Sequence, residues 1–403
     1  MLQPERFSRF GDWTPWQGLS VSGRLEELRP FYAGDQASNR MDAVRRAIND
    51  IRSNWDRYPQ FMHELRIFME AHGLDSGDRD DQSAKRLRAI FSSTKEWLEP
   101  EMASGNSDYS AIQLYTSEYG YRKMFQTINL AFRSDHLEDD AQALRCATFL
   151  VELLTIDLFN YRAANTGADN FEGHVYRGMS VSAEDLEMFG RITRGPIAER
   201  YLAIPLAMAS ASRDRIKALA FALEECSRKP GRYPLLWDIT VSGMSPGLLH
   251  VYQERFPESV VTSLCAVPID RLSDYHDEKE VVLRGPHFQI LRLTKRENAE
   301  AAAGPIHVIE ALMLNSNRDH ISAIASNIGQ DRRSRDLFRT LITIERSAIC
   351  AQHAERCGRS ADADSYHEMV RKNRAALPAL MDAAAALSRS GKAARGQAVA
   401  PDR

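Results

Sequence analysis

Residues 204–222 read IPLAMASASRDRIKALAFA, in which a short apolar strand runs directly into a helix. Ser212 precedes the helical pattern and is of a residue type that caps helix N-termini, and Asp214 would then lie in the first turn. With Ser212 used as the cap, Ser210 is left at the strand end, where its hydroxyl can hydrogen-bond a ligand. The segment therefore predicts a strand–helix unit with a polar binding edge.

Short apolar or β-branched runs surround this segment and predict further strands, because Gly, Pro and polar turns separate them. They lie at residues 174–176, 202–208, 235–241, 281–283, 288–293 and 306–312. A sheet-forming region of roughly 140 residues is long enough for one domain core. Since helical patterns flank this region on both sides, the sequence predicts an α+β fold.

Helical patterns outside the sheet-forming region predict where the other parts of the chain begin and end. Val44, Ile48, Ile51 and Trp55 fall on one stripe of an amphipathic helix. We expect an N-terminal helical region with a linker at 1–85, a main domain at 86–314 (helical lobe 86–166, sheet core 167–314) and a C-terminal helical region at 315–403. Within the last region, residues 337–350 and 361–375 predict a helical hairpin, and the basic, Ala-rich tail beyond residue 379 is expected to fray at its end.

The composition narrows the class of protein. The formal charge of -3, from 52 Lys+Arg against 55 Asp+Glu, gives no basic excess, so nucleic acid is not favoured as a partner. The 5 cysteines are scattered without a CxxC pair, which favours a reducing compartment over a disulfide framework or a zinc cluster. The first residues lack a secretory signal and no apolar run is long enough to span a bilayer. We therefore expect no membrane partner, and either a cytoplasmic protein or an effector delivered to a host cytosol.

The segment Val175-Tyr176-Arg177-Gly178 places an arginine at the end of a short strand, immediately before a glycine. The planar fork of an arginine can clamp phosphates through two hydrogen bonds, and a glycine lets backbone approach a ligand closely. Taken alone, however, a strand-end arginine is usually a solvated or salt-bridged surface residue.

Residues 272–283 read LSDYHDEKEVVL and end in an apolar strand. Glu278 and Glu280 are two positions apart at its start, which predicts that both side chains leave the same face. Like charges held side by side are unfavourable unless a cation or a cationic transition state shares them. An isolated Glu-Lys-Glu, by contrast, is typical of the solvated start of a strand.

The order Arg177, then Ser210-Ala211-Ser212, then Glu278-Lys279-Glu280 resembles the R-S-E signature of the ADP-ribosyltransferase toxins and the arginine-specific ectoenzymes. The flanks agree: Tyr-Arg-Gly around the arginine, Leu-Ser-x-Tyr before the acidic pair, and a helical stretch at 112–129 that resembles the family's N-terminal lobe. The resemblance runs from about residue 111 to residue 314. One departure is Ala211, where the family usually has threonine.

The resemblance implies a core of two small packed β-sheets with flanking helices, and an enzyme that splits NAD and transfers ADP-ribose. NAD is then a substrate, and no metal is needed. NAD would contact Arg177, Gly178, Ser210, Ser212 and Glu280. The catalytic residues would be Glu280 and Glu278 together with Ser210 and Arg177. Glu280 would stabilise the cationic ribose, Arg177 would secure the phosphates, and Ser210 would orient the nicotinamide-ribose end.

Glu278 lies where arginine-modifying members of the family have an acidic residue. A guanidinium is a poor nucleophile because its pKa is above ~12, so a second carboxylate that pairs with it and takes its proton has a chemical purpose. Arginine on a target protein is therefore the preferred acceptor. Tyr275 matches the aromatic residue of the family's acceptor-recognition turn and would pack against the incoming side chain; the alternative is an ordinary turn aromatic.

Several alternatives stay open at this point. The same cleft can deliver ADP-ribose to water, which makes an NAD glycohydrolase, or to RNA or DNA. A different class is a helical interaction protein that carries an inactive transferase domain. The helical flanks are candidate surfaces for the target or for a regulatory partner, although their amphipathic stripes are first explained by their own packing. The sequence equally fits a toxin, a delivered effector or an internal regulator.

Overall fold

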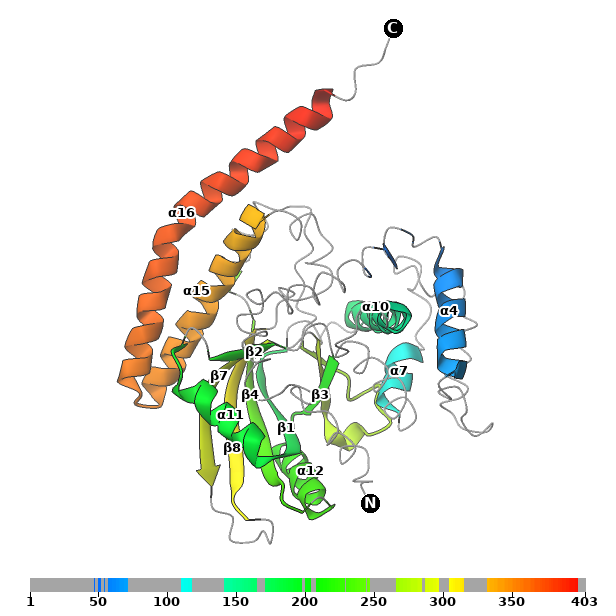
Figure 1. Ribbon diagram of the computed structural model, residues 1–403, viewed down its shortest axis with the longest axis vertical. Coiled ribbons are helices and arrows are strands. Elements are labelled where there is room, and N and C mark those ends of the chain that lie inside the picture. Colours follow the sequence, from blue (N-terminus) through cyan, green and yellow to red (C-terminus); the bar gives the residue numbers. More distant parts are fainter. Residues whose placement is uncertain are drawn as a thin grey trace. The chain divides into compact units, whose positions relative to one another are not determined.

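The computed structural model (Figure 1) describes most of the region in which strands are expected and the helices on either side of it. The described residues are 58–71, 110–117, 141–164, 171–197, 200–203, 208–228, 230–243, 266–284, 287–296, 304–314 and 332–397, with single positions 47, 50, 51, 54, 57, 245 and 246. They divide into two compact units. The first contains the sheet, and the second contains the two C-terminal helices.

The first unit is built on one mixed sheet of eight strands in the order β2-β7-β8-β4-β1-β3-β6-β5. Every neighbouring pair is antiparallel except β4 and β8, which run parallel. The strands are β1 (Gly173–Val181), β2 (Tyr201–Ala203), β3 (Met208–Ser212), β4 (Tyr233–Ser242), β5 (Ala266–Pro268), β6 (Glu280–Arg284), β7 (His287–Arg296) and β8 (Ile306–Leu314). Five of the six predicted runs coincide with β1, β4, β6, β7 and β8; the sixth begins in β2 and continues into residues 204–207, which lie outside the described residues.

The sheet consists of two groups of strands that meet at a narrow junction. β3, β6 and β5 form one group, and β1, β4, β8, β7 and β2 form the other. The groups are joined by the single residue pair Tyr176↔Ser212, between β1 and β3. Together with the helices around it, this arrangement confirms the predicted α+β class, and the two expected small sheets are present as two strand groups with one shared pair.

One face of the larger group is closed by α11 (Ala183–Arg194). Trp237 of β4 is 2% exposed and lies between two rings, Phe189 of α11 at 5.6 Å and Phe288 of β7 at 5.3 Å. Its indole nitrogen also lies 3.3 Å from the Met179 sulfur. Large aromatic side chains dominate the burial energy of a core, so Trp237 is its centre on this face.

The opposite face is covered by α12 (Arg215–Arg228), and Gly178 makes this possible. A Cβ at position 178 would lie 1.7 Å from the carbonyl oxygen of Ala218 on α12, closer than any real atom can approach. The helix backbone therefore rests directly on β1. Since side chains alternate along a strand, Arg177 points away from α12 and shares the α11 face with its cross-strand neighbour Trp237.

Gly178→Ala is accordingly expected to destabilise the first unit by about 3 kcal/mol or more, or to prevent folding, because overpacking against a helix backbone cannot be relieved by a side-chain rotation. Gly195→Ala is the matched control: the nearest atom to its Cβ would be 3.4 Å away, and its φ of -69° suits any residue. Thermal unfolding of the two variants measures the difference. Equal melting temperatures would contradict the close packing at Gly178.

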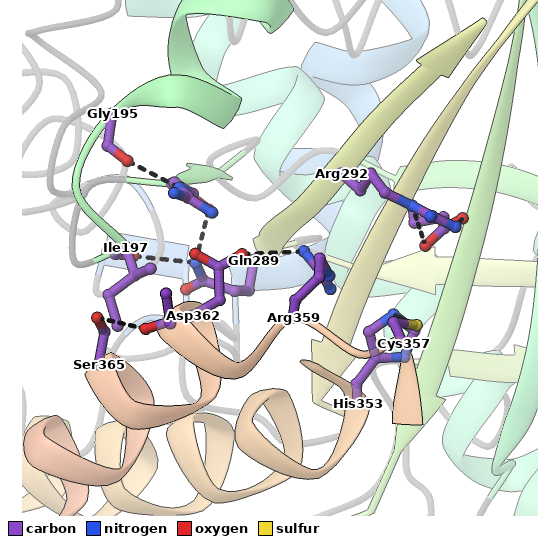
Figure 2. Close-up of polar contacts among 12 residues, drawn as sticks. Gly195, Ile197, Gln289, Arg292, His353, Cys357, Arg359, Asp362 and Ser365 are labelled. Atoms are coloured by element: carbon purple, nitrogen blue, oxygen red, sulfur yellow. Dashed lines mark hydrogen bonds and ion pairs between the residues drawn. The ribbon is translucent and has the colours of Figure 1, made fainter. Parts of the chain in front are cut away.

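The edge of the sheet at β2 and β7 is fastened by side-chain to backbone hydrogen bonds (Figure 2). The amide nitrogen of Gln289 on β7 donates to the carbonyl oxygens of Ile197 (3.1 Å) and Arg200 (2.8 Å). Arg200 in turn donates from Nε to the Gly195 carbonyl at 2.7 Å. These bonds hold the connection between α11 and β2 against β7, so the edge strand has a fixed position.

The first unit also contains the helices α4 (Tyr58–Ala71), α7 (Ser110–Thr116) and α10 (Ala141–Ala164). α10 lies within the helical lobe that the sequence predicts at 86–166. Pro59 lies in the first turn of α4, where a proline is tolerated because its missing N–H has no helical partner. Asp157 of α10 is 2% exposed and accepts hydrogen bonds from the backbone N–H groups of Ala111 (2.8 Å) and Ile112 (3.2 Å), so it caps α7.

Burial raises the pKa of Asp157 to about 7, and the two backbone hydrogen bonds oppose this shift. A folded-state pKa above the unfolded value of 3.8 means that the group's contribution to stability is present at low pH and is lost as pH rises to about 7. Asp157→Asn should therefore gain stability relative to the wild type between about pH 4 and pH 7. Because the pKa of Asp157 is raised by about three units, the stability that Asp157→Asn gains over the wild type has an upper bound of roughly 4 kcal/mol. The free energy of unfolding of both proteins, measured against pH, checks this expectation. If it changed with pH equally in the two proteins, the raised pKa of Asp157 would be contradicted.

The second unit is a helical hairpin of α15 (Arg332–Arg356) and α16 (Ser360–Gln397), which pack against each other. It confirms the predicted hairpin. α16 continues through Pro378 as far as Gln397 and past the end of α15 (Figure 1), since the alanines and leucines of the tail are strong helix formers. The end of the tail, where fraying is expected, lies outside the described residues. At the turn, Arg359 pairs with Asp362 at 3.2 Å (Figure 2).

Two elements were missed by the sequence reasoning. α11 has a capping box, in which the Ser182 hydroxyl accepts from the Asp185 N–H (3.1 Å) and the Asp185 carboxylate accepts from the Ser182 N–H (2.9 Å). This Ser-x-x-Asp signal could have located the helix. β5 is only three residues long and has no such signal. The linker expected before residue 86, most of the stripe around Val44 and the part of the stretch 112–129 that follows residue 117 lie outside the described residues.

Candidate active site

Arg177 lies in the interior of the first unit, at the junction of the two strand groups. Its side chain is 4% exposed, and Nη1 donates a hydrogen bond of 2.6 Å to the backbone carbonyl of Ser210 on β3. The plain interpretation of a strand-end arginine, a solvated surface residue, is therefore wrong here. Burial of a guanidinium is costly unless hydrogen bonds are made inside the protein, and the bond to the Ser210 carbonyl is one of these.

Ser210 and Ser212 share one face of β3, since they are two positions apart on a strand. Antiparallel pairing with β6 places Ser212 directly opposite Glu280, and Ser210 opposite Val282. Side chains at directly opposed positions have Cβ atoms about 5 Å apart, so Ser212 and Glu280 are neighbours. The two serines and Glu280 are at most 2% exposed. Arg177, Ser210 and Glu280 lie far apart in the sequence and are thus connected through β3.

Ser212 is not the N-cap of the following helix, contrary to the sequence interpretation. α12 begins at Arg215, and Asp214 caps it by accepting from the N–H groups of Ile216 (2.9 Å) and Lys217 (3.4 Å). A carboxylate one residue before the helix reaches these donors, whereas Ser212 is still in the strand. The Ser212 hydroxyl instead accepts from the Asp214 N–H (2.9 Å) and donates to the Glu278 carbonyl (2.5 Å). Ser212 therefore joins β3 to the acidic turn.

Glu278 and Glu280 do not belong to the same strand, which corrects the argument from strand alternation. Glu278 ends a single 3-10 turn, η6 (His276–Glu278), and only Glu280 lies in β6. Lys279 between them has a φ of 49° and a ψ of 50°, a left-handed conformation that turns the chain sharply. Both carboxylates are nevertheless buried, with Glu278 1% exposed and Glu280 0% exposed. Their closeness in the fold comes from this turn and from the contact with Ser212.

The outer side of the acidic turn is held to the start of α12 by charged groups. Lys217 pairs with Asp277 at 3.1 Å, and Lys279 lies 3.8 Å from Asp214. The backbone N–H of Arg213 also donates to the Lys279 carbonyl at 3.1 Å. Exposed ion pairs contribute little individually, about 0–1 kcal/mol each, so the buried Ser212 bond and the backbone bond fix the turn while the ion pairs restrict its outer surface.

Tyr275 and His276 lie where the chain enters the 3-10 turn. Tyr275 is half-buried immediately before the turn, and a contact between its ring and an incoming side chain stays a prediction. His276 is exposed, and its Nδ1 lies 2.6 Å from the Asp270 carbonyl oxygen. Among the residues that the structure describes, no group of three or more His, Cys, Asp or Glu side chains could hold a metal ion.

Gly178 has a structural reason to be a glycine that the sequence did not suggest. Its α-carbon faces α12 rather than the Arg177 side of β1, because the helix backbone occupies the space of a side chain. A contact between Gly178 and NAD stays a prediction, and the close approach that the structure shows is to Ala218.

No family model matches the sequence, and no curated protein matches it either. Among solved structures it is similar to the Vis toxin, an ADP-ribosyltransferase from Vibrio splendidus: the alignment has 14% identity, covers 60% of this chain and 88% of that chain, and has a TM-score of 0.33. The structure of Vis with the M6 inhibitor aligns at 15% identity, covers 60% of this chain and 88% of that chain, and has a TM-score of 0.34. The structure of Vis with agmatine aligns at 15% identity, covers 60% of this chain and 89% of that chain, and has a TM-score of 0.32. Since these scores are below 0.5, the assignment of the site rests on its own residues and distances.

In the part of the chain that the structure describes, each helix is too short or too polar to cross a membrane.

Proposed function

We propose that this protein is an NAD-dependent mono-ADP-ribosyltransferase that transfers ADP-ribose to arginine on a target protein and releases nicotinamide. One observation carries the proposal: contacts through β3 connect Arg177, the two serines and Glu280 at the junction of the strand groups. Arg177 reaches the Ser210 carbonyl at 2.6 Å, and Ser212 stands opposite Glu280. This is the order of residue types that the R-S-E resemblance requires.

Glu280 is the principal catalytic group in this proposal. When the bond between nicotinamide and ribose breaks, nicotinamide leaves as a neutral molecule and positive charge grows on the ribose. A fixed carboxylate beside the sugar stabilises that charge, and it does so most strongly where water is excluded. Glu280 is 0% exposed and begins a buried strand, which gives it a fixed position.

Arg177 and Ser210 hold the substrate in a reactive geometry. The guanidinium of Arg177 provides charge and directional donors for the phosphates of NAD, and the Ser210 hydroxyl orients the nicotinamide-ribose end. The two residues are linked because the Arg177 side chain donates a hydrogen bond to the Ser210 carbonyl. Gly178 and Ser212 complete the expected NAD contacts, although each also has the structural role described above.

Glu278 is the acceptor carboxylate in this proposal, with Tyr275 beside it. An arginine acceptor must lose a proton as it attacks the ribose, and a carboxylate that pairs with the guanidinium can accept it. Glu278 is fixed by the hydrogen bond from Ser212 to its carbonyl, so it is held close to Glu280 without being on the same strand.

We further propose that the enzyme acts in a reducing cytosol. The four described cysteines, Cys146, Cys226, Cys350 and Cys357, are free thiols, and the first three are buried. Burial raises the pKa of the Cys146 thiol to about 11 and that of Cys226 to about 12, which keeps both thiols protonated and slow to oxidise. The second unit is proposed as a surface for the target or for a regulatory partner.

Incubation of the protein with labelled NAD and a cell lysate tests the proposed acceptor. Label should enter protein, and excess agmatine, a small guanidine, should compete for it. Label that is removed by nuclease, or that stays on protein undiminished by agmatine, would contradict arginine as the acceptor. Label found only in free ADP-ribose would instead favour NAD hydrolysis.

A further inference from the structure

Ser273 is a buried serine that the roles assigned above leave unused. It is 1% exposed and lies between β5 and η6, seven positions before Glu280. Its hydroxyl donates a hydrogen bond of 3.2 Å to Oε2 of Glu280 and accepts one of 3.2 Å from the backbone N–H of Tyr275. One hydroxyl therefore touches the carboxylate assigned to catalysis and the residue assigned to acceptor recognition.

The direction of these bonds follows from the groups involved. An ionised carboxylate can only accept, and a backbone N–H can only donate, so the hydroxyl must give its single proton to Glu280 and receive the proton of Tyr275. Hydrogen bonds in such a chain polarise one another, which makes the hydroxyl a stronger donor to the carboxylate. Ser273 is thus suited to hold the Glu280 carboxylate in one orientation.

The backbone fixes this geometry through a single residue, Ile269, which is fully buried. The Ser273 N–H donates to the Ile269 carbonyl at 3.0 Å, and the Ile269 N–H donates to the Glu280 carbonyl at 2.9 Å. Ser273 and Glu280 are therefore tied to the same point of the chain, so their side chains meet without depending on a mobile loop.

We infer that Ser273 is a positioning residue for the proposed reaction: it orients the Glu280 carboxylate and links that orientation to the backbone of the acceptor turn at Tyr275. The inference rests on the proposed NAD cleavage, in which Glu280 acts on the ribose. A serine with only a turn-forming role would accept from Tyr275 and would have no effect on turnover, because hydroxyls commonly bond the N–H two residues on. The donated bond to Glu280 distinguishes the two roles.

The test compares Ser273→Ala, Ser273→Thr and Ser180→Ala in nicotinamide release. Ser180 is the matched control, because it is also a buried serine of the first unit, and its hydroxyl accepts from Arg232 at 2.9 Å, away from the site. We expect Ser273→Ala to lower kcat about tenfold with the KM for NAD changed less than about twofold, since a misoriented carboxylate affects the transition state more than the ground state. Ser273→Thr, which keeps the hydroxyl, should restore kcat to within about threefold of the wild type, and Ser180→Ala should leave it unchanged.

A folded Ser273→Ala protein with wild-type kcat would overturn the inference, and so would an equal loss in Ser180→Ala. An independent readout is amide hydrogen exchange at Tyr275, which should be slow in the wild type and at least about tenfold faster in Ser273→Ala. If wild-type protein does not cleave NAD, the proposed function fails, and the exchange measurement still decides the Ser273 link: unchanged exchange at Tyr275 would exclude it. Wild-type cleavage with no effect of Ser273→Ala would leave the proposed function intact and reject the positioning role alone.

Discussion

Glu280→Gln is expected to lower nicotinamide release from NAD by at least about a hundredfold, the scale on which removal of one preorganised electrostatic group reduces turnover. The substitution keeps the size of the side chain and its capacity for hydrogen bonding. It removes the negative charge that would stabilise the cationic ribose at a position that is 0% exposed. Initial rates at saturating NAD, measured by separation of free nicotinamide, check the expectation.

A second buried glutamate of the same unit provides the control. Glu225 on α12 is 1% exposed and accepts from the Ser180 N–H at 2.8 Å, so Glu225→Gln also replaces a buried carboxylate without touching the junction of the strand groups. It should affect stability but not turnover by the folded protein. Near-normal turnover by folded Glu280→Gln would remove Glu280 from the catalytic role.

Glu278→Gln should separate the two halves of the reaction. Glutamine cannot carry the charge that pairs with a guanidinium or take its proton, so transfer to agmatine is expected to fall by at least about a hundredfold. Water is small and needs no such pairing, so most of the NAD hydrolysis should remain. Asp277→Asn is the control, because Asp277 precedes Glu278 in the same 3-10 turn and pairs with Lys217 on the outside.

Hydrolysis and agmatine transfer are measured side by side on these proteins. Equal loss of both activities in Glu278→Gln would show that the two carboxylates act as one unit, and the assignment of Glu278 to the acceptor would then be wrong. The left-handed turn at Lys279 makes separate roles plausible in physical terms, because it gives the two glutamates different backbone environments.

The sequence was most informative where local patterning determines the structure. Short apolar or β-branched runs located most of the strands, and Arg177, Ser210 and Glu280 lie on three strands, β1, β3 and β6, that pair through β3. Local rules failed where a tertiary contact decides. Ser212 has the residue type of a helix cap, but the strand continues through it and Asp214 takes that role.

The acidic motif shows the same limit. Alternation along a strand predicts that Glu278 and Glu280 share a face, yet the strand starts only at Glu280, because Lys279 turns the chain and the Glu278 carbonyl is bound by Ser212. The parallel pairing of β4 with β8 and the single contact between β1 and β3 join segments distant in the sequence, and short apolar runs carry no information about such partners. Gly178 illustrates the converse: a glycine first interpreted as a ligand contact is required by a helix backbone.

The most direct test of the account is nicotinamide release by the purified wild-type protein incubated with NAD and agmatine, with the products quantified together. The account predicts that nicotinamide appears in an amount equal to the sum of ADP-ribosylagmatine and free ADP-ribose, with the agmatine adduct increasing as agmatine is raised. Folded protein that leaves NAD intact under these conditions would contradict it.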